Sequence, residues 1–549
     1  MPMKKDKHEL RLMFWSRKME FAHNKSGNAI LLITYSLMSL LPGCTQTRYE
    51  QSLIHPHPKD KPFQECSVNL DTYKSVQSRC GQDANLAIAV AASGGGYRAA
   101  NFAAGALLGL EEITAGDSRN NNALSQVDYF STVSGGGFAV GTYISSLHDY
   151  LYFKGTFDGY SFAEALAQPA AKCPCRTAAT DQSYDPCIRS HLQGLYRDFI
   201  NDFLKTLLPW ERLGFHERGF RFEQAIDDDI LGYRWRKEKL TSLSDADVFG
   251  TKNMARNASL LLSDVFLAAD DNQTQMVLPY WVTNATVYEN GAIFAFTPDQ
   301  LREYKITGYP HRLKKYRFAY WQENYNVFLQ NVPLAVGVTS SANFPFALPA
   351  NTLTSQMDPN NPYVYLLDGG LADNLGVFTA VRLLDAQSHK AIVIKTLIVI
   401  DSYQGGLAPF SNIKNPPAEA DTAVRALQIG LDSWRVRYRK IIDDLCKSKD
   451  IHPVYLSFDD LLDADFNDLY PFGLSEKDKL ELCKKKSRNC PNPTPFLLVR
   501  SISMTSPVVM GEKGLEYRLP PSQQNLLLAS GRYVVHKKKP EILAALAWE

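Results

Sequence analysis

The sequence Leu86-Ala-Ile-Ala-Val-Ala-Ala-Ser-Gly-Gly-Gly-Tyr-Arg-Ala99 joins a short apolar run to three consecutive glycines. The uninterrupted apolar run predicts a buried parallel strand over residues 86–92. Apolar residues then recur at helical spacing from Ala99 to Leu110, which predicts a helix. The glycines therefore lie at a strand-to-helix turn, and this succession is typical of an α/β fold.

This glycine turn can bind negative charge through its main chain. Glycines at the start of a helix let the amides of Gly95 and Gly96, with Gly94 beside them, point into one concavity at the positive end of the helix dipole. Such a turn holds either a reaction oxyanion or the phosphate of a nucleotide. The absence of G-x-G-x-x-G spacing and of a G-K-[ST] ending counts against the nucleotide, but the turn alone leaves both open.

Ser134 lies in a second strand-to-helix turn. Residues 127–133 resemble a strand, and the apolar spacing from Phe138 to Leu147 predicts a helix after it. A serine between the two is the arrangement of a nucleophile elbow, although Thr132 replaces the first glycine of G-x-S-x-G. The alternative is that Ser134 only caps the following helix.

Asp368 follows a third predicted strand, residues 363–367, and begins the turn Asp368-Gly-Gly-Leu-Ala-Asp-Asn374. Its carboxylate therefore emerges at the end of a strand, where ligands gather in open α/β sheets. An aspartate with the ordinary pKa of about 3.9 is a weak base, so catalysis requires a partly desolvated site. The alternative is an Asx turn without a chemical role.

Taken together and in this order, the motifs S-G-G-G-Y-R-A, V-S-G-G and D-G-G-x-x-x-N resemble those of the patatin-like phospholipases and the cytosolic phospholipase A group. Residues 278–286 resemble a core strand of that family, and residues 335–345 resemble its small-residue loop before the aspartate. The resemblance covers about residues 84–405 and is poor between 150 and 270. It implies a three-layer α/β/α fold with a central, mostly parallel sheet. It also implies a catalytic Ser134 and Asp368, an oxyanion hole at Gly94, Gly95 and Gly96, and phosphate recognition by Arg98.

We therefore expect a serine acyl hydrolase that cleaves phospholipids or lysophospholipids through a Ser-Asp dyad and an acyl-enzyme, without a cofactor or a metal. A Ser-Asp-His triad is the alternative mechanism, with His389, His452 and His536 as candidates. A neutral-lipid esterase or an acyltransferase would use the same dyad. A catalytically silent lipid-binding protein of the cell envelope is the alternative from another class.

The N-terminal region predicts export. Basic residues precede an apolar run over residues 29–41 that is shorter than the about 20 residues of a bilayer span, as in a signal peptide. The run ends in Leu41-Pro-Gly-Cys44, which resembles a bacterial lipobox with Cys44 as the lipidated residue. We expect a membrane-bound lipoprotein of the cell envelope, in the outer membrane and facing the periplasm or the exterior. Ordinary cleavage or an uncleaved anchor are alternatives, and translation from Met19 is possible.

Eight further cysteines accompany Cys44, and an even number in an oxidising compartment favours disulfides. Cys66 with Cys80 is the best local pair. The segment Cys173-Pro-Cys175 with Cys187 and His191 could instead bind zinc through three thiolates and an imidazole.

The 549 residues with a net charge of +1 give no reason to expect a nucleic-acid partner. The expected order is a signal peptide with lipobox (1–43), a tether (44–83), a first catalytic part (84–148), a helical insertion (149–270), a second catalytic part (271–410) and a C-terminal extension (411–549). In the insertion, an apolar helix face over residues 192–207 could form a lid over acyl chains or ordinary core. In the extension, a helix is expected with Tyr438, Ile441 and Leu445 on its apolar side.

Overall fold

The computed structural model describes residues 85–115, 122–154, 160–166, 278–308, 332–345, 348–386 except 359, 394–403, 438–484, 493–502 and most of 508–548. It also describes short stretches within 219–232 and 260–265. The predictions for the signal peptide, Cys44, the tether, Cys66 with Cys80, the zinc alternative and the apolar face of 192–207 concern residues outside this part of the chain. Across the described residues, no helix combines the length and the apolar character needed to span a bilayer.

The centre of the molecule is a sheet of five parallel strands in the order β3-β2-β1-β8-β9. These strands are β1 (Leu86–Ala92), β2 (Tyr129–Thr132), β3 (Tyr280–Val287), β8 (Ile394–Asp401) and β9 (His452–Ser457). All seven residues of β1 are buried, as expected for a strand covered on both faces. Ala92 lies opposite both Thr132 and Ile400, so these strands end at one edge.

Antiparallel strands extend the sheet beyond β3 in the order β7-β6-β5, and β4 also pairs with β3. Their bounds are β4 (Ile293–Ala295), β5 (Ile306–Gly308), β6 (Asn351–Ser355) and β7 (Tyr363–Asp368). β3 continues past the end of β2, and β7 runs back along this extra length, so Asp368 lies opposite Ala285. The chain thereby brings the end of an antiparallel strand to the carboxyl edge of the parallel ones.

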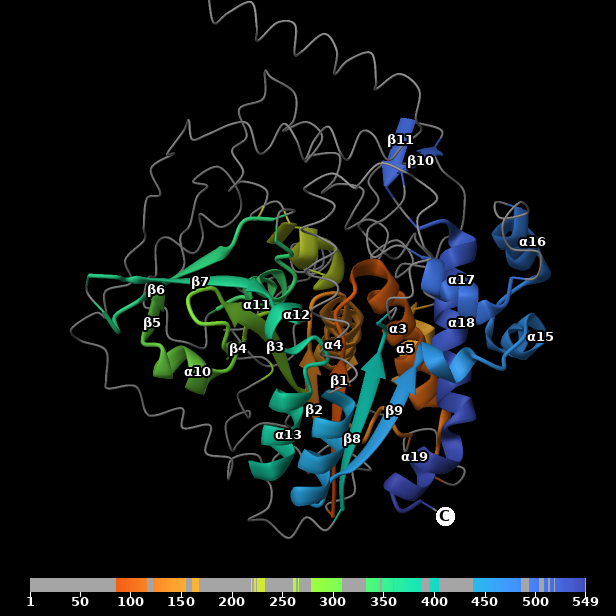
Figure 1. The fold of residues 1–549 in the computed structure, drawn as a ribbon, viewed down its shortest axis with the longest axis horizontal. Coiled ribbons are helices and arrows are strands. Elements are labelled where there is room, and N and C mark those ends of the chain that lie inside the picture. The colour runs from red at the N-terminus through yellow and green to blue at the C-terminus, as the bar shows by residue number, and fades with distance from the viewer. Residues whose placement is uncertain are drawn as a thin grey trace, which may run out of the picture.

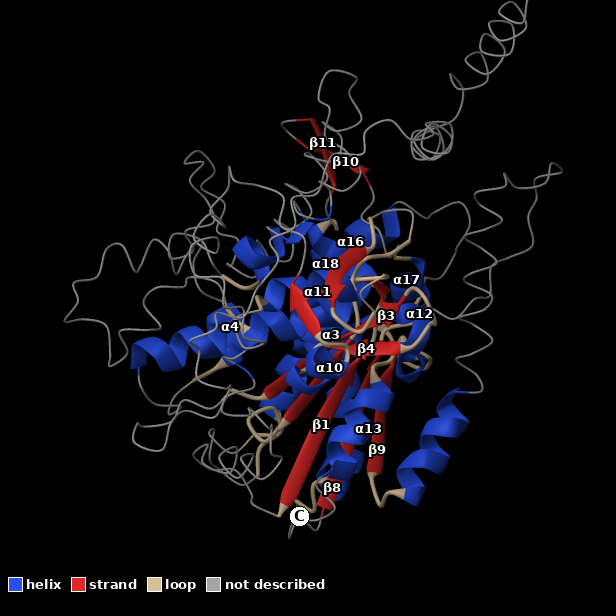
Figure 2. Cartoon of the chain, turned by 90° about the vertical axis from the view of Figure 1, so that its left-hand side faces the viewer, coloured by secondary structure: helices blue, strands red, loops and turns tan. Residues whose placement is uncertain are grey.

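Helices cover both faces of the parallel strands, as Figures 1 and 2 show. One layer contains α3 (Gly96–Glu112), α4 (Gly135–Lys154) and α18 (Pro521–Lys537), and the other contains α13 (Val377–Asp385) with the helix 438–448. Neighbouring residues of β2 point to opposite layers: Ser131 donates a hydrogen bond to the carbonyl of Gly376 before α13, whereas Thr132 faces Gly137 of α4. The three-layer α/β/α fold with a parallel central sheet is therefore confirmed.

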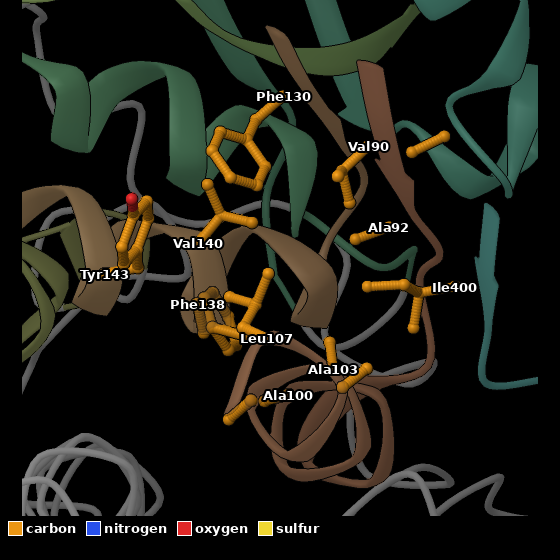
Figure 3. Packing of buried hydrophobic residues seen from close by; sticks show 14 of the residues in the cluster. Val90, Ala92, Ala100, Ala103, Leu107, Phe130, Phe138, Val140, Tyr143 and Ile400 are labelled. Atoms are coloured by element: carbon orange, nitrogen blue, oxygen red, sulfur yellow. The ribbon is translucent and has the colours of Figure 1, made fainter. Parts of the chain in front are cut away.

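The main hydrophobic core lies between the sheet and the layer of α3 and α4 (Figure 3). Phe138 and Tyr143 of α4 pack towards Phe130 of β2 and Leu107 of α3. The rings of Phe130 and Tyr143 meet edge to face with 5.7 Å between their centroids. Burying such side chains stabilises the fold by roughly 1.5–3 kcal/mol each, so this core fixes both turns that precede the two helices.

α3 and α18 pack with their backbones almost in contact. A β-carbon on Gly105 would lie 2.2 Å from the carbonyl oxygen of Leu528, and one on Gly531 would lie 2.3 Å from that of Phe102. Residues without side chains are therefore required on both helices. At the end of this seam, Glu112 accepts a hydrogen bond from Arg532 (2.9 Å) and bonds His536 (2.7 Å).

The remaining elements connect these layers or lie around them. They are α5 (Phe162–Leu166), the π-helix η4 (Ile226–Ile230), α10 (Pro298–Glu303), α11 (Leu334–Ser341), α12 (Gly370–Asp373), the 3-10 helices η9 (Phe458–Leu461) and η10 (Tyr470–Phe472), α15 (Phe466–Leu469), α16 (Glu476–Lys484), α17 (Pro495–Ser501), α19 (Lys539–Ala545) and the hairpin β10 (Val508–Gly511) with β11 (Gly514–Tyr517).

Three details differ from the expectations. Residues 334–341 form the helix α11 instead of a loop, because all eight residues are buried and the helix pairs their backbone groups. The region after residue 410 supplies β9 and α18, so it shares the core of the catalytic part. In the helix 438–448, Ile442 is fully buried and Ile441 is 42% exposed, so the apolar side follows Tyr438, Ile442 and Cys446.

Candidate active site

Ser134 lies in a sharp turn between β2 and α4. Its φ of 48° is in the left-handed region, which a non-glycine residue adopts only when its surroundings require it. The turn packs directly against the glycine turn, because a β-carbon on Gly135 would lie 2.1 Å from the carbonyl oxygen of Gly96. The amide of Ser134 donates a hydrogen bond to the hydroxyl of Ser341 (2.9 Å). The elbow geometry expected from the sequence is therefore present.

The glycine turn begins α3 and adopts backbone angles that favour glycine. Gly95 has a φ of 139° and Gly96 a φ of 58°. Within the described residues, the amides of Gly95, Gly96 and Gly135 donate to no protein acceptor. The amide of Gly94, in contrast, donates to the carbonyl of Asn374 (2.9 Å). The expected oxyanion hole therefore loses Gly94 as a donor, and Gly135 becomes a candidate beside Gly95 and Gly96.

Asp368 and Ser134 meet at this edge of the sheet. The hydroxyl of Ser134 lies close enough to the carboxylate of Asp368 to lower its pKa, and the carboxylate accepts a hydrogen bond from the amide of Gly370 (2.8 Å). Only 5% of Asp368 and 9% of Ser134 is exposed. Desolvation by burial raises the pKa of Asp368 to about 6, while the hydrogen bonds from Gly370 and Ser134 partly oppose this rise. A carboxylate with this pKa is a stronger base than an exposed aspartate and is ionised at neutral pH.

The main chain around Asp368 is fixed by β3 and by the loop after α11. Its amide donates to the carbonyl of Asn343 (3.0 Å), and its carbonyl accepts the hydroxyl of Thr286 on β3 (2.8 Å). The next residue, Gly369, must be glycine, because a β-carbon there would lie 2.1 Å from the carbonyl oxygen of Asn284. These contacts determine the direction of the carboxylate independently of its side-chain bonds.

A buried polar cluster connects β3 to β2, the strand before the elbow. Asn284 donates from its side-chain amide to the hydroxyl of Ser131 (2.9 Å) and to the carbonyl of Thr132 (3.1 Å), and its amide oxygen accepts the hydroxyl of Thr379 (2.6 Å). Networks of this kind hold a site rigid when their groups are satisfied. No sequence pattern indicated this cluster, because Ser131 and Asn284 are single polar residues inside expected strands and Thr379 lies outside the motifs.

Arg98 lies in the first turn of α3, directly after the glycines, and is only 1% exposed. Its guanidinium donates to the carbonyls of Ser402 (3.2 Å) and Ile502 (3.1 Å) and lies 6.0 Å from the centre of the Phe458 ring. Burial lowers its pKa to about 10. This placement corrects the expected phosphate-binding role, because a buried guanidinium bonded to two carbonyls braces the turn.

The two described histidines of the alternative triad lie away from the dyad. His536 bonds Glu112 at the far end of α3, which is about 24 Å from Gly96 at a rise of about 1.5 Å per residue. His452 is exposed and begins β9, whereas the dyad lies beyond the other end of the parallel strands. His389 lies outside the described residues.

Cys446 is a buried free thiol, so the even set of cysteines is not fully paired in disulfides. Burial raises its pKa to about 12, which keeps the thiol protonated. In the part of the chain that the structure describes, no three histidine, cysteine or acidic side chains are grouped to hold a metal ion.

Comparisons with known proteins add little to this geometry. No protein-family model matches the chain, and no curated protein matches its sequence. Among solved structures, human GIVD cytosolic phospholipase A2 is similar with a TM-score of 0.33 and 12% sequence identity. The match covers 87% of this chain, which spans 65% of the length of that protein. This likeness is too low to support a statement about activity.

Proposed function

We propose that this protein is a serine acyl hydrolase in which Ser134 is the nucleophile and Asp368 its base. The observation that carries the proposal is the approach of these two buried side chains to each other at a strained elbow. Ser134 and Asp368 are separated by more than 200 residues in sequence, and the cost of their burial and backbone strain is typical of functional sites. Partner-free amides beside the hydroxyl supply what the developing oxyanion needs.

The proposed reaction needs no group beyond these. Asp368 accepts the hydroxyl proton as the oxygen of Ser134 attacks an ester carbonyl, and the amides of Gly95, Gly96 and Gly135 stabilise the oxyanion. Asp368 then protonates the leaving alcohol, and the acyl group stays on Ser134. Water releases it in a second step that returns the proton to the serine oxygen. With both described histidines placed elsewhere, the dyad is favoured over the triad.

We further propose a lipid ester, a phospholipid or lysophospholipid, as the substrate. This assignment rests on the three motifs and their order, which resemble those of patatin-like and cytosolic phospholipases. Arg98, which bonds two main-chain carbonyls, no longer contributes to it. The lipobox-like sequence before Cys44 supports a membrane surface as the partner and the bacterial cell envelope as the location.

The substrate is tested by product analysis of the purified protein with vesicles of phospholipid, lysophospholipid or triacylglycerol, each with and without an added alcohol. Release of fatty acid from the phospholipids, lost in Ser134→Ala, is the expected result. Release from triacylglycerol alone would make the protein a neutral-lipid esterase, and preferential transfer to the alcohol would make it an acyltransferase. A protein that hydrolyses none of these and reacts with no fluorophosphonate would be a silent lipid-binding protein.

A further inference from the structure

Asn374 lies between the two turns that form the site. Its main-chain carbonyl accepts the amide of Gly94, which holds it against the glycine turn. Its side-chain oxygen lies 2.6 Å from the point that a β-carbon on Gly94 would occupy and 2.7 Å from the equivalent point on Gly370. The carboxamide therefore fills the space that the absent side chains of these two glycines leave.

The same two points adjoin the proposed dyad. The β-carbon of Ser134 lies 3.4 Å from the point on Gly94, and the carboxylate oxygen Oδ1 of Asp368 lies 3.0 Å from the point on Gly370. The carboxamide of Asn374 is thus a neighbour of both the hydroxyl-bearing residue and the base.

The side chain of Asn374 has no protein hydrogen-bond partner among the described residues, and it is half-buried. The carboxamide has two donors and an acceptor oxygen, and leaving these groups unpaired in a half-buried site costs free energy. A ligand or a water molecule that pairs with them removes that cost. Such a molecule would also lie next to Ser134 and Asp368.

We infer that Asn374 positions the water that hydrolyses the acyl-enzyme, an inference that rests on the proposed function. The water donates one hydrogen to Asp368 and the other to the side-chain oxygen of Asn374, so that its lone pair faces the acyl carbon on Ser134. As the water oxygen bonds to that carbon, its proton moves to Asp368. The bond to the serine oxygen then breaks, this oxygen recovers the proton from Asp368, and the free acid leaves.

The neutral carboxamide suits this second step and not the first. In the resting site, the hydroxyl of Ser134 already lies beside Asp368, so the first proton transfer needs no further orienting group. Once Ser134 carries the acyl group, its hydrogen is gone and water must take its place beside Asp368. An uncharged acceptor orients that water without competing for the proton.

The experiment compares Asn374→Ala with the unaltered protein by rapid mixing with a p-nitrophenyl ester, which separates the acylation burst from steady turnover. We expect a burst rate within about threefold of the unaltered protein and a deacylation rate about a hundredfold lower, the usual effect of misplacing a reactant. Intact-mass analysis will then find the acyl-enzyme accumulating. Hydroxylamine, a stronger nucleophile, will restore most of the turnover. Asn361→Ala is the matched control, because Asn361 is exposed and, among the described residues, bonds Asp358 alone in another turn.

Equal losses in the burst and in steady turnover would overturn the inference, and so would a change in KM alone, which would indicate substrate binding. Unchanged kinetics would also overturn it. In each of these cases a fluorophosphonate adduct on Ser134 of the unaltered protein would leave the proposed function intact. Absence of that adduct and of any burst in the unaltered protein would overturn the proposed function and, with it, the role of Asn374.

Discussion

The candidate active site and the α3–α18 seam both use glycines to bring backbones into contact, but they differ in the polar groups that remain without a hydrogen-bond partner. At the candidate active site, Gly135 packs on the main chain of Gly96, and at the α3–α18 seam, Gly105 packs on the main chain of Leu528. The contacts are equally close, at 2.1 and 2.2 Å for the missing β-carbon. The site, however, retains amides without a partner among the described residues and a carboxylate with a raised pKa, whereas the seam ends in paired charges at Glu112.

Close backbone packing therefore does not identify a functional site by itself. What distinguishes the site is the set of polar groups that its packing holds unsatisfied or desolvated. Substitutions at the site should therefore change chemistry with little effect on stability, and substitutions at the seam should do the reverse.

The largest expected effect is that of Ser134→Ala on ester hydrolysis. Removal of a nucleophile typically lowers kcat by at least about 10⁴-fold, and here the melting temperature should change little because the hydroxyl is the only group removed. The measurement is kcat with a soluble ester together with a thermal melt. Ser146→Ala on α4, whose hydroxyl bonds Tyr160, is the control and should retain full activity. Hydrolysis that survives in Ser134→Ala would place the nucleophile elsewhere.

Gly105→Ala should have the largest effect on stability. The added methyl group would lie 2.2 Å from the Leu528 oxygen, so α3 and α18 must separate, at a cost of about 2–3 kcal/mol. The rate per folded molecule should stay within about threefold, since Gly105 lies nine residues, about 14 Å, along α3 from the glycine turn beside the dyad. Urea unfolding monitored beside activity tests both statements.

Gly291→Ala provides the comparison for that experiment. Gly291 has a positive φ of 71°, unlike Gly105, and nothing lies within 4 Å of its missing β-carbon. Only backbone strain of roughly 1 kcal/mol is expected there. Equal losses in the two variants would show that the seam is not closely packed.

The pH dependence of activity reports whether Asp368 of the site is desolvated. The base must be ionised, and burial raises its pKa to about 6, so kcat/KM should be constant above about pH 7 and fall tenfold per unit below 6. An exposed aspartate would keep the enzyme active to about pH 4. A pH–rate profile with a soluble ester measures this, and a profile that stays flat down to pH 4.5 would contradict a desolvated base.

The smallest effect is expected for Glu112→Gln in the seam. Burial alone would raise the pKa of Glu112, but hydrogen bonds from His536 and Arg532 outweigh it and hold the pKa below its ordinary value. This carboxylate therefore stabilises the fold above a pH of about 4.3, and its contribution is lost as the pH falls through the lowered pKa. The variant should lose about 1 kcal/mol at pH 7, with the difference shrinking in acid. A difference that does not change with pH would contradict this account.

Short-range patterns made the site largely predictable from the sequence. β1, the glycine turn, the elbow and the strand before Asp368 each follow from a few consecutive residues, because strand and helix periodicity is a local property. The positions of Ser341 and Asn284 could not be found in this way, since their roles depend on which elements pack together. Asn374 was visible as the end of D-G-G-x-x-x-N, but the sequence did not reveal its place beside Gly94.

The roles of Arg98 and of the C-terminal region show a second limit. A cationic side chain after a glycine turn suggests an anion-binding group. In the fold, however, the guanidinium of Arg98 donates to the carbonyls of residues 402 and 502. Likewise, β9 and α18 look like an appendage in sequence, and only long-range pairing makes them part of the core. Contacts across hundreds of residues decide both cases.

Whether Asp368 acts as the base of Ser134 is measured by the rate of fluorophosphonate labelling in Asp368→Asn. The asparagine keeps the shape of the side chain but cannot accept the proton, so labelling at Ser134, located by peptide mass spectrometry, should slow by at least about 10²-fold at pH 8. The variant should melt at least as high as the unaltered protein. Labelling of Ser134 at an unchanged rate in a folded Asp368→Asn variant would contradict the dyad.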